Sequence, residues 1–258
     1  MLVKLDGSSI NVNTNDFSST LVRGGIENQE KVNISGSTQT LATAGSSKTL
    51  WGLDVDHYQQ TDASRLYIKS SSANDTSSGT GARTVEITGI KSDKTVDTET
   101  VNLNGTGAVQ TTNSYFLIYN FMVTSVGSTG SNVGDIKAYV SHVDNEIVNY
   151  IKATENNSSM CIYRVPANKI ILLKNIIVNG QCNGCNLHIR IKNTNSVEFS
   201  EFVFRLNGFG RHIDFTIDKT YSTDNIIWIK LVSDSDLIER TKNCAISVIL
   251  NGILFNSE

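Results

Sequence analysis

Two cysteines separated by two residues form the pattern in this sequence that most directly suggests chemistry. Cys182 and Cys185 have the spacing of a zinc knuckle or of a redox pair. Cys161 and Cys244 stand alone, so a tetrahedral metal site would need these two, or a histidine, to converge on the pair. We therefore expect cysteines that are reduced and structural or that lie in turns, and the role of Cys182 and Cys185 stays open.

Two glycine-rich segments resemble catalytic loops only in part. Residues 127–130 (Gly-Ser-Thr-Gly) place a serine beside glycine, but they lie between expected strands with no helix after them. The strand-turn-helix elbow that presents a nucleophilic serine is therefore missing. Residues 79–81 (Gly-Thr-Gly) lack the lysine and the following helix of a phosphate-binding loop. We interpret the first segment as a connection and the second as a tight turn.

Acidic and imidazole side chains offer no complete constellation either. The pairs Asp54/Asp56 and Asp234/Asp236 could ligate calcium or act as glycosidase carboxylates, but neither lies in a complete calcium-binding loop. Such pairs are mostly solvated. The four histidines are scattered, at His57, His142, His188 and His212. We predict that the protein is not an enzyme and has no catalytic residue, no bound metal and no cofactor.

Composition excludes several classes of partner. The 258-residue chain carries a net charge of −3 and no basic block, so it has no electrostatic footprint for nucleic acid or an anionic membrane. It begins without the apolar run of a signal peptide and contains no stretch of the ~18 apolar residues that a membrane span requires. We expect a soluble protein made in a cytoplasm, with neither nucleic acid nor membrane as a partner.

The elements that must position these side chains are strands. In residues 84–88 Val85 and Ile87 alternate with polar residues, and Val101 and Leu103 repeat the alternation after a short polar connection. Period-two alternation is typical of half-buried strands, and the short connection predicts an antiparallel hairpin. The second half of the chain has seven similar segments, at 161–165, 170–178, 187–192, 202–206, 212–217, 226–231 and 245–250.

Many short strands separated by Asn, Gly, Ser and Asp turns predict an all-β fold, an antiparallel β-sandwich or jelly roll with almost no helix. Residues 1–50 are poor in apolar side chains and are expected to form an extended arm or short edge strands. Residues 51–155 are expected to form a β-sandwich lobe and residues 156–258 a jelly-roll-like lobe. Whether the two lobes pack as one domain stays open.

One predicted strand has apolar side chains on both faces. Tyr115, Tyr119 and Phe121 share one face, and Phe116 and Met122 lie on the other. Both faces of such a strand must be covered, either by the chain's own core or by another subunit. We take Tyr115, Tyr119 and Phe121 as the candidate subunit or capsid interface.

Several ordered strings resemble a family of virion structural proteins of tailed bacteriophages, many of them marine. The strings lie at residues 72–76, 79–85, 101–106, 112–115, 123–128, 132–136 and 163–169. The last is similar to the strand-turn-strand pattern Tyr-x-Val-Pro-Ala-Gly-Lys, with Asn168 where glycine is usual. Because asparagine tolerates the left-handed conformation better than most residues, we expect this turn to persist.

The resemblance implies a place in a virus particle. It suggests a capsid decoration protein of the jelly-roll type, a homotrimer bound to the major capsid protein lattice on the capsid surface. A head-fibre or tail protein that binds a receptor or a glycan is the alternative. A glycan-degrading enzyme on the particle is the third possibility.

Overall fold

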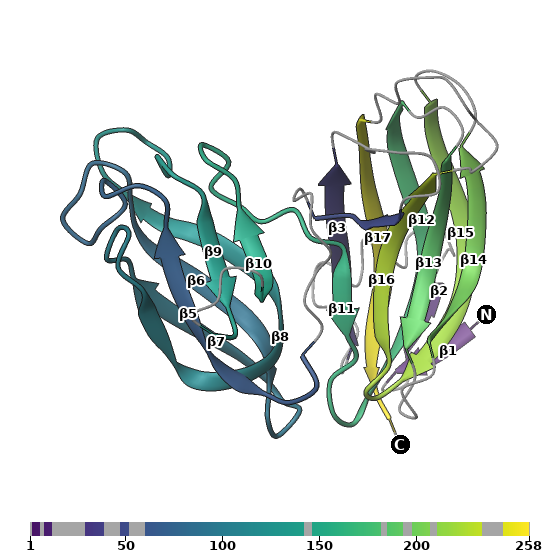
Figure 1. Cartoon of the computed structure of the whole chain (residues 1–258). Coiled ribbons are helices and arrows are strands. Elements are labelled where there is room, and N and C mark those ends of the chain that lie inside the picture. The colour runs from purple at the N-terminus through teal and green to yellow at the C-terminus, as the bar shows by residue number, and fades with distance from the viewer. Residues whose placement is uncertain are drawn as a thin grey trace.

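The computed structural model consists of strands arranged in two lobes that lie side by side (Figure 1). It describes residues 2–5, 8–11, 29–38, 47–51, 60–141, 146–181, 185–192, 198–206, 211–233 and 245–257. Within these ranges there is no α-helix, and every sheet is antiparallel, which confirms the predicted all-β fold class. Accordingly, the described ranges contain no helix long and apolar enough to cross a membrane.

The first lobe is a single six-stranded sheet in the order β10-β9-β5-β8-β6-β7. Its strands are β5 (Ser64–Ser70), β6 (Ala82–Lys91), β7 (Val96–Asn102), β8 (Val109–Val126), β9 (Ile136–Tyr139) and β10 (Ile147–Ile151). The pairing of β6 with β8 shifts register at several points. Such irregularities bend strands and increase their twist. The sheet therefore curls around its own core (Figure 1).

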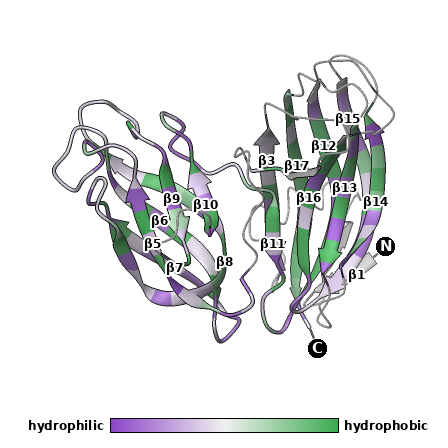
Figure 2. Cartoon of the chain, viewed as in Figure 1, coloured by the Kyte–Doolittle hydropathy of each residue, from purple (hydrophilic) through white to green (hydrophobic). Residues whose placement is uncertain are grey.

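Alternation in β5 and β6 supplies much of that core. Leu66, Ile68, Val85 and Ile87 are fully buried, and the polar residues between them remain accessible. Figure 2 shows the resulting bands of hydrophobic and hydrophilic residues along the strands of both lobes. The predicted hairpin is confirmed, because β6 pairs with β7 and Val85 lies opposite Val101.

The second lobe, called the sandwich lobe here, packs two sheets face to face (Figure 1). One has the order β15-β12-β17-β3, and the other has the order β11-β16-β13-β14 with β4 paired to β16. The strands are β3 (Gln29–Thr38), β4 (Ser47–Thr49), β11 (Ile162–Arg164), β12 (Lys169–Gln181), β13 (Cys185–Lys192), β14 (Glu198–Leu206), β15 (Arg211–Ser222), β16 (Ile226–Ser233) and β17 (Ala245–Asn256). Two further strands, β1 (Leu2–Leu5) and β2 (Ser8–Asn11), form a separate hairpin.

Strand β13 illustrates how alternation builds the sandwich core. Leu187, Ile189 and Ile191 are fully buried, whereas the polar residues between them are partly exposed. Full burial of each such side chain contributes roughly 1.5–3 kcal/mol to folding relative to exposure.

The path of the chain differs from the expected division into lobes. Strand β3 pairs with β17, and β4 pairs with β16, so residues 29–38 and 47–49 complete the sandwich lobe rather than forming a separate arm. The alternative of edge strands fits β3, which is the last strand of its sheet. The first lobe is thus inserted between β4 and β11. The sequence hid this because only Val32 and Ile34 of β3 are buried apolar side chains.

The turn that resembles the phage pattern persists as expected. Asn168 adopts a left-handed backbone with φ 56°, and the amide of Lys169 donates to the carbonyl of Pro166 at 3.3 Å. Asparagine therefore takes the conformation that glycine provides in the related pattern.

The cysteines correct part of the sequence prediction. Cys161 is free and fully buried, and this burial raises the pKa of its thiol. Cys185, in contrast, is disulfide-bonded, so the expectation of a reduced set is wrong for this residue. Cys182 and Cys244 lie outside the described residues.

Candidate functional site

The three predicted interface residues occupy different environments. Tyr115 and Phe121 are fully buried in the core of the first lobe, so neither offers surface to another subunit. Tyr119 is partly buried and packs against the core of the sandwich lobe. Strict alternation along β8 placed the three side chains on one face. However, β8 shifts register against both neighbouring strands, so residues at even spacing along it do not all face the same way. The subunit interface itself stays a prediction.

The hydroxyl of Tyr115 connects two strands of the first lobe. Its hydroxyl donates to Asp97 at 3.2 Å and to Glu99 at 3.3 Å, both on β7. Burial first, and then the negative charges of Glu99 and Asp97, raise the pKa of Tyr115 because all three disfavour the phenolate. The contact fastens β7 to β8 at the edge of the sheet.

Tyr119 joins the two lobes. Its ring meets the ring of Tyr163 on β11 edge to face, with centroids 5.1 Å apart and an interplanar angle of 61°. Edge-to-face pairs at this separation are favourable because the positive rim of one ring faces the negative face of the other.

A cleft of about 240 Å³ opens beside this tyrosine pair. Residues 30–35 of β3, Tyr119 and Asn120 of β8, and four residues of the segment 158–163 line it. Burial first, and then the carboxylate of Glu30, raise the pKa of Tyr119 to about 12. Burial, Tyr119 and Glu30 likewise raise the pKa of Tyr163. The two phenols thus stay protonated, and Glu30 is the charged group that acts on both.

An apolar cluster backs this junction. It contains residues of both lobes, including Leu117 of β8 and Tyr139 of β9 from the first lobe and Met160 and Trp228 from the sandwich side. Trp51, which follows β4, belongs to the same cluster and is nearly fully buried. The lobes therefore share buried hydrophobic surface and form one packed unit.

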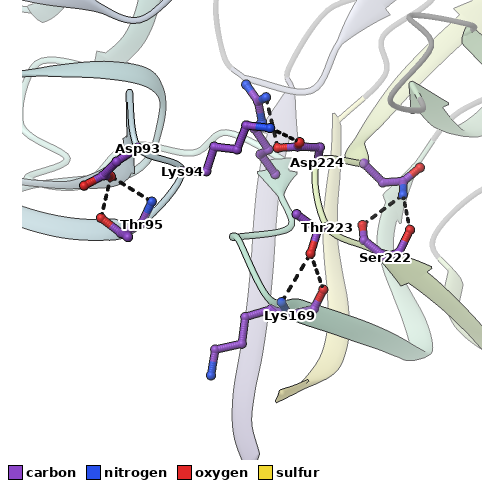
Figure 3. Close-up of polar contacts among 9 residues, drawn as sticks. Asp93, Lys94, Thr95, Lys169, Ser222, Thr223 and Asp224 are labelled. Carbon is purple, nitrogen blue, oxygen red and sulfur yellow. Dashed lines mark hydrogen bonds and ion pairs between the residues drawn. The ribbon is translucent and has the colours of Figure 1, made fainter. Parts of the chain in front are cut away.

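A second junction lies at the turn between β6 and β7. Lys94, in this turn, forms an ion pair with Asp224 of the sandwich lobe (Figure 3). Arg164 pairs with the same carboxylate at 3.2 Å. The guanidinium of Arg164 also lies over the ring of Phe116 on β8, 4.4 Å from its centroid. The amide of Ala167 donates to the carbonyl of Lys94 at 2.9 Å. Charge, cation–π and backbone contacts thus converge between the lobes.

Asp75 organises the other end of the first lobe. Its carboxylate is fully buried and accepts four hydrogen bonds: from Ser70 Oγ at 2.6 Å, from the amides of Ala82 and Gly134 at 2.8 Å, and from the amide of Val133 at 2.9 Å. We call Asp75 together with residues 70–82, 103–107 and 127–135 the loop hub. Such a carboxylate is stabilised without a countercharge because each oxygen receives two donors.

Backbone contacts complete the loop hub. The amide of Gly105 donates to the carbonyl of Asp75 at 2.7 Å, and the amide of Gly127 donates to the carbonyl of Gly81 at 2.7 Å. A Cβ on Gly127 would lie 2.4 Å from the carbonyl oxygen of Gly79. The glycine segments considered as catalytic loops are therefore packed turns, and this close approach requires the absence of a side chain.

The remaining sequence candidates are not brought together. His188 lies on β13 with its Nδ1 3.0 Å from Ser200 Oγ, whereas His212 on β15 of the other sheet contacts Asn179 at 2.6 Å. Burial and then Arg190 lower the pKa of His188. The described residues contain no group of three His, Cys, Asp or Glu side chains that could hold a metal. Several candidates lie outside the described residues: Asp54, Asp56, His57, His142, Cys182, Asp234 and Asp236.

Comparisons with known proteins leave the family open. No protein-family model matches the chain, and no curated protein matches it. Similar solved structures include infectious bursal disease virus of the Gt strain, at 9% identity and TM-score 0.20, covering 93% of this chain and 80% of that one. They also include the VP2 subviral particle of infectious bursal disease virus, at 9% identity and TM-score 0.24, covering 90% and 72%.

A protein from Parabacteroides distasonis is similar at 9% identity and TM-score 0.19, with coverage of 90% and 91%. The neighbours thus include structures of a virus and of a subviral particle. All of these TM-scores are below 0.5, so the likeness carries no argument about function.

Proposed function

We propose that this chain is a non-catalytic structural component of a virus particle. The observation that carries the proposal is the loop hub. The strings at 72–85 and 132–136 that resemble phage virion proteins are the segments that Asp75 holds together. The polar groups of these segments form hydrogen bonds that hold the loops together, as expected of a structural protein with a rigid shape.

Within the particle, the proposed role is decoration of the capsid surface by a homotrimer bound to the major capsid protein lattice. Three copies that engage neighbouring lattice sites together bind far more tightly than one copy, because the later contacts become intramolecular. The shared apolar cluster between the lobes supports this role, since a decoration protein must transmit contacts across its length without bending.

The edge strand β14 offers a surface for contacts between subunits. Val203 is 54% exposed and Phe199 is 38% exposed, and β14 is the last strand of its sheet. Exposed apolar side chains on an open sheet edge are typical of pairing surfaces. We assign the trimer contact to this edge in place of Tyr115 and Phe121.

A disulfide at Cys185 agrees with a protein that functions outside a reducing cytoplasm. Proteins on the surface of a released virus particle are in such an environment. The bond would form after synthesis, on exposure to an oxidising medium.

Light scattering and co-sedimentation test the proposal. The wild-type chain is expected to be a trimer and to pellet with capsids assembled from the major capsid protein alone. Val203→Lys should give a folded monomer that pellets weakly. Val96→Lys, the same change at a valine that is 45% exposed on β7 of the first lobe, should behave as wild type. A chain that stays in the supernatant but binds host cells would move the role to a fibre, and one that does neither would overturn the virion role.

A further inference from the structure

We propose that the cleft between the lobes binds a neutral saccharide unit. The site consists of Tyr119, Tyr163 and Glu30 with the amide side chains of Asn33 and Asn120 at its walls. This inference does not depend on the capsid role, because the cleft is formed within one chain.

The two phenols provide groups that a ligand can use. In the described part of the chain neither the Tyr119 nor the Tyr163 hydroxyl has a hydrogen-bond partner. Tyr163 is only 3% exposed, and it lines the cleft. The buried unpaired polar atoms of the described residues include neither hydroxyl, so both oxygens remain open to the cleft and to a ligand in it. A sugar hydroxyl supplies both a donor and an acceptor.

Strand β3 adds a second set of polar groups. Because β3 is the last strand of its sheet, half of its backbone N–H and C=O groups point away from β17. Residues 30–35 of this strand form one wall of the cleft. Small-molecule sites commonly combine aromatic side chains with a few such fixed polar groups.

The charge at the cleft favours a neutral ligand. Glu30 and Lys31 both line the cleft, and Glu30 lies close enough to act on both phenols. Because one negative and one positive group offset each other, the cleft gives no advantage to an acidic or a basic sugar, and both groups can form hydrogen bonds with sugar hydroxyls.

The shape of the cleft selects a compact ligand over an extended peptide. Beyond residue 35 the edge of β3 is closed, since a Cβ on Gly36 would lie 2.6 Å from the carbonyl oxygen of Leu50 and 2.7 Å from the Cys161 amide nitrogen. Ser37 Oγ and Ser159 Oγ are also hydrogen-bonded at 2.7 Å. The volume of about 240 Å³ lies below the ~300–1,000 Å³ of common ligand pockets, so the site suits one sugar ring.

The test is NMR titration of the full chain with glucose, galactose, mannose and N-acetylglucosamine, one at a time. We expect at least one of them to bind and to shift the resonances of residues that line the cleft. Tyr119→Phe and Glu30→Gln each remove one polar function with little change in volume, and each should weaken binding at least tenfold. Tyr221→Phe is the matched control, since it removes a buried hydroxyl on β15 far from the cleft.

Three results would overturn the inference: no binding of any of the four sugars, equal binding by Tyr119→Phe and wild type, or stronger binding of sialic acid than of the neutral sugars. Binding of an alternating threonine–valine octapeptide, with all four sugars silent, would instead identify the edge of β3 as a peptide site. Loss of sugar binding would leave co-sedimentation with capsids unchanged, so failure of this inference and failure of the capsid role are distinguishable.

Discussion

Gly81 lies so close to Asp75 that a Cβ on Gly81 would be 2.1 Å from the Asp75 Oδ1 atom. The two residues belong to the string that most resembles phage virion proteins, and their contact explains why a glycine stands there. The carboxylate is held on all sides by the loop hub, so it cannot move aside to admit a methyl group.

Gly81→Ala should therefore destabilise the first lobe by at least about 3 kcal/mol, the upper end of overpacking costs. Urea unfolding followed by circular dichroism measures the loss. The control is Gly130→Ala, because Gly130 has φ 74° but nothing within 4 Å of a new Cβ. That variant should lose only about 1 kcal/mol, the strain of a left-handed alanine. Equal losses for the two variants would contradict the clash.

Asp75→Asn keeps the shape of the side chain but replaces one acceptor oxygen with an NH₂ group. This NH₂ would face backbone N–H donors that have no other partner. Removing one partner from a buried charged network typically costs about 3–5 kcal/mol, and we expect a loss of that size in urea unfolding. Asp93→Asn, at an exposed turn where Asp93 accepts from Thr95, should leave the unfolding midpoint unchanged. A stable Asp75→Asn protein would show that the loop hub does not depend on the charge.

The ion pairs at Asp224 should contribute measurably to the contact between the lobes. Asp224 and Arg164 side chains are each 15% exposed, so solvent screens their attraction only in part. Asp224→Asn should cost about 1–2 kcal/mol, because it leaves the largely buried guanidinium of Arg164 without its charged partner.

Asp218→Asn is the matched control for Asp224→Asn. Asp218 pairs with Lys174 at an exposed site, and both aspartates have a left-handed backbone that asparagine tolerates. Exposed pairs contribute about 0–1 kcal/mol, so this variant should unfold close to wild type. Unfolding of the two variants at the same urea concentration would show that the junction does not rest on the ion pairs.

Alkaline pH should destabilise the contact between Tyr119 and Tyr163 that joins the two lobes. The pKa of Tyr119 is raised from 10.0 to about 12 in the folded protein, so the folded state holds this proton more tightly than the unfolded chain does. The resulting stabilisation is complete below pH 10 and is lost as pH rises toward 12. Urea midpoints measured from pH 8 to 11.5 should fall less steeply for Tyr119→Phe than for wild type. Parallel pH profiles would contradict the assignment.

Local features of the fold could be predicted from the sequence, and contacts between distant segments could not. The β6–β7 hairpin and the Asn168 turn rest on neighbouring residues, so alternation and turn chemistry were sufficient. The pairing of β3 with β17 joins residues from opposite ends of the described chain, for example Asn33 and Asn251, and no local pattern encodes it.

The candidate site shows the same limit. Tyr119 was identified from its aromatic character, but its partners Tyr163 and Glu30 lie on β11 and β3, which only tertiary packing brings near. Asp75 gave no signal beyond its place in an ordered polar string. Its importance depends on the backbone N–H groups of Val133 and Gly134, which donate hydrogen bonds to Asp75 from a distant part of the sequence.

The insertion of the first lobe between β4 and β11 has a consequence for biosynthesis. During translation β3 emerges well before its partner strand β17, and all six strands of the first lobe are made between them, so β3 must wait for its partner while the first lobe assembles. Long-range pairings of this kind slow folding, because the chain loses conformational entropy in closing a long loop before the contact contributes any favourable free energy. On the ribosome the first lobe is therefore expected to assemble before the sandwich lobe, and β3 is expected to dock only once β17 has been made.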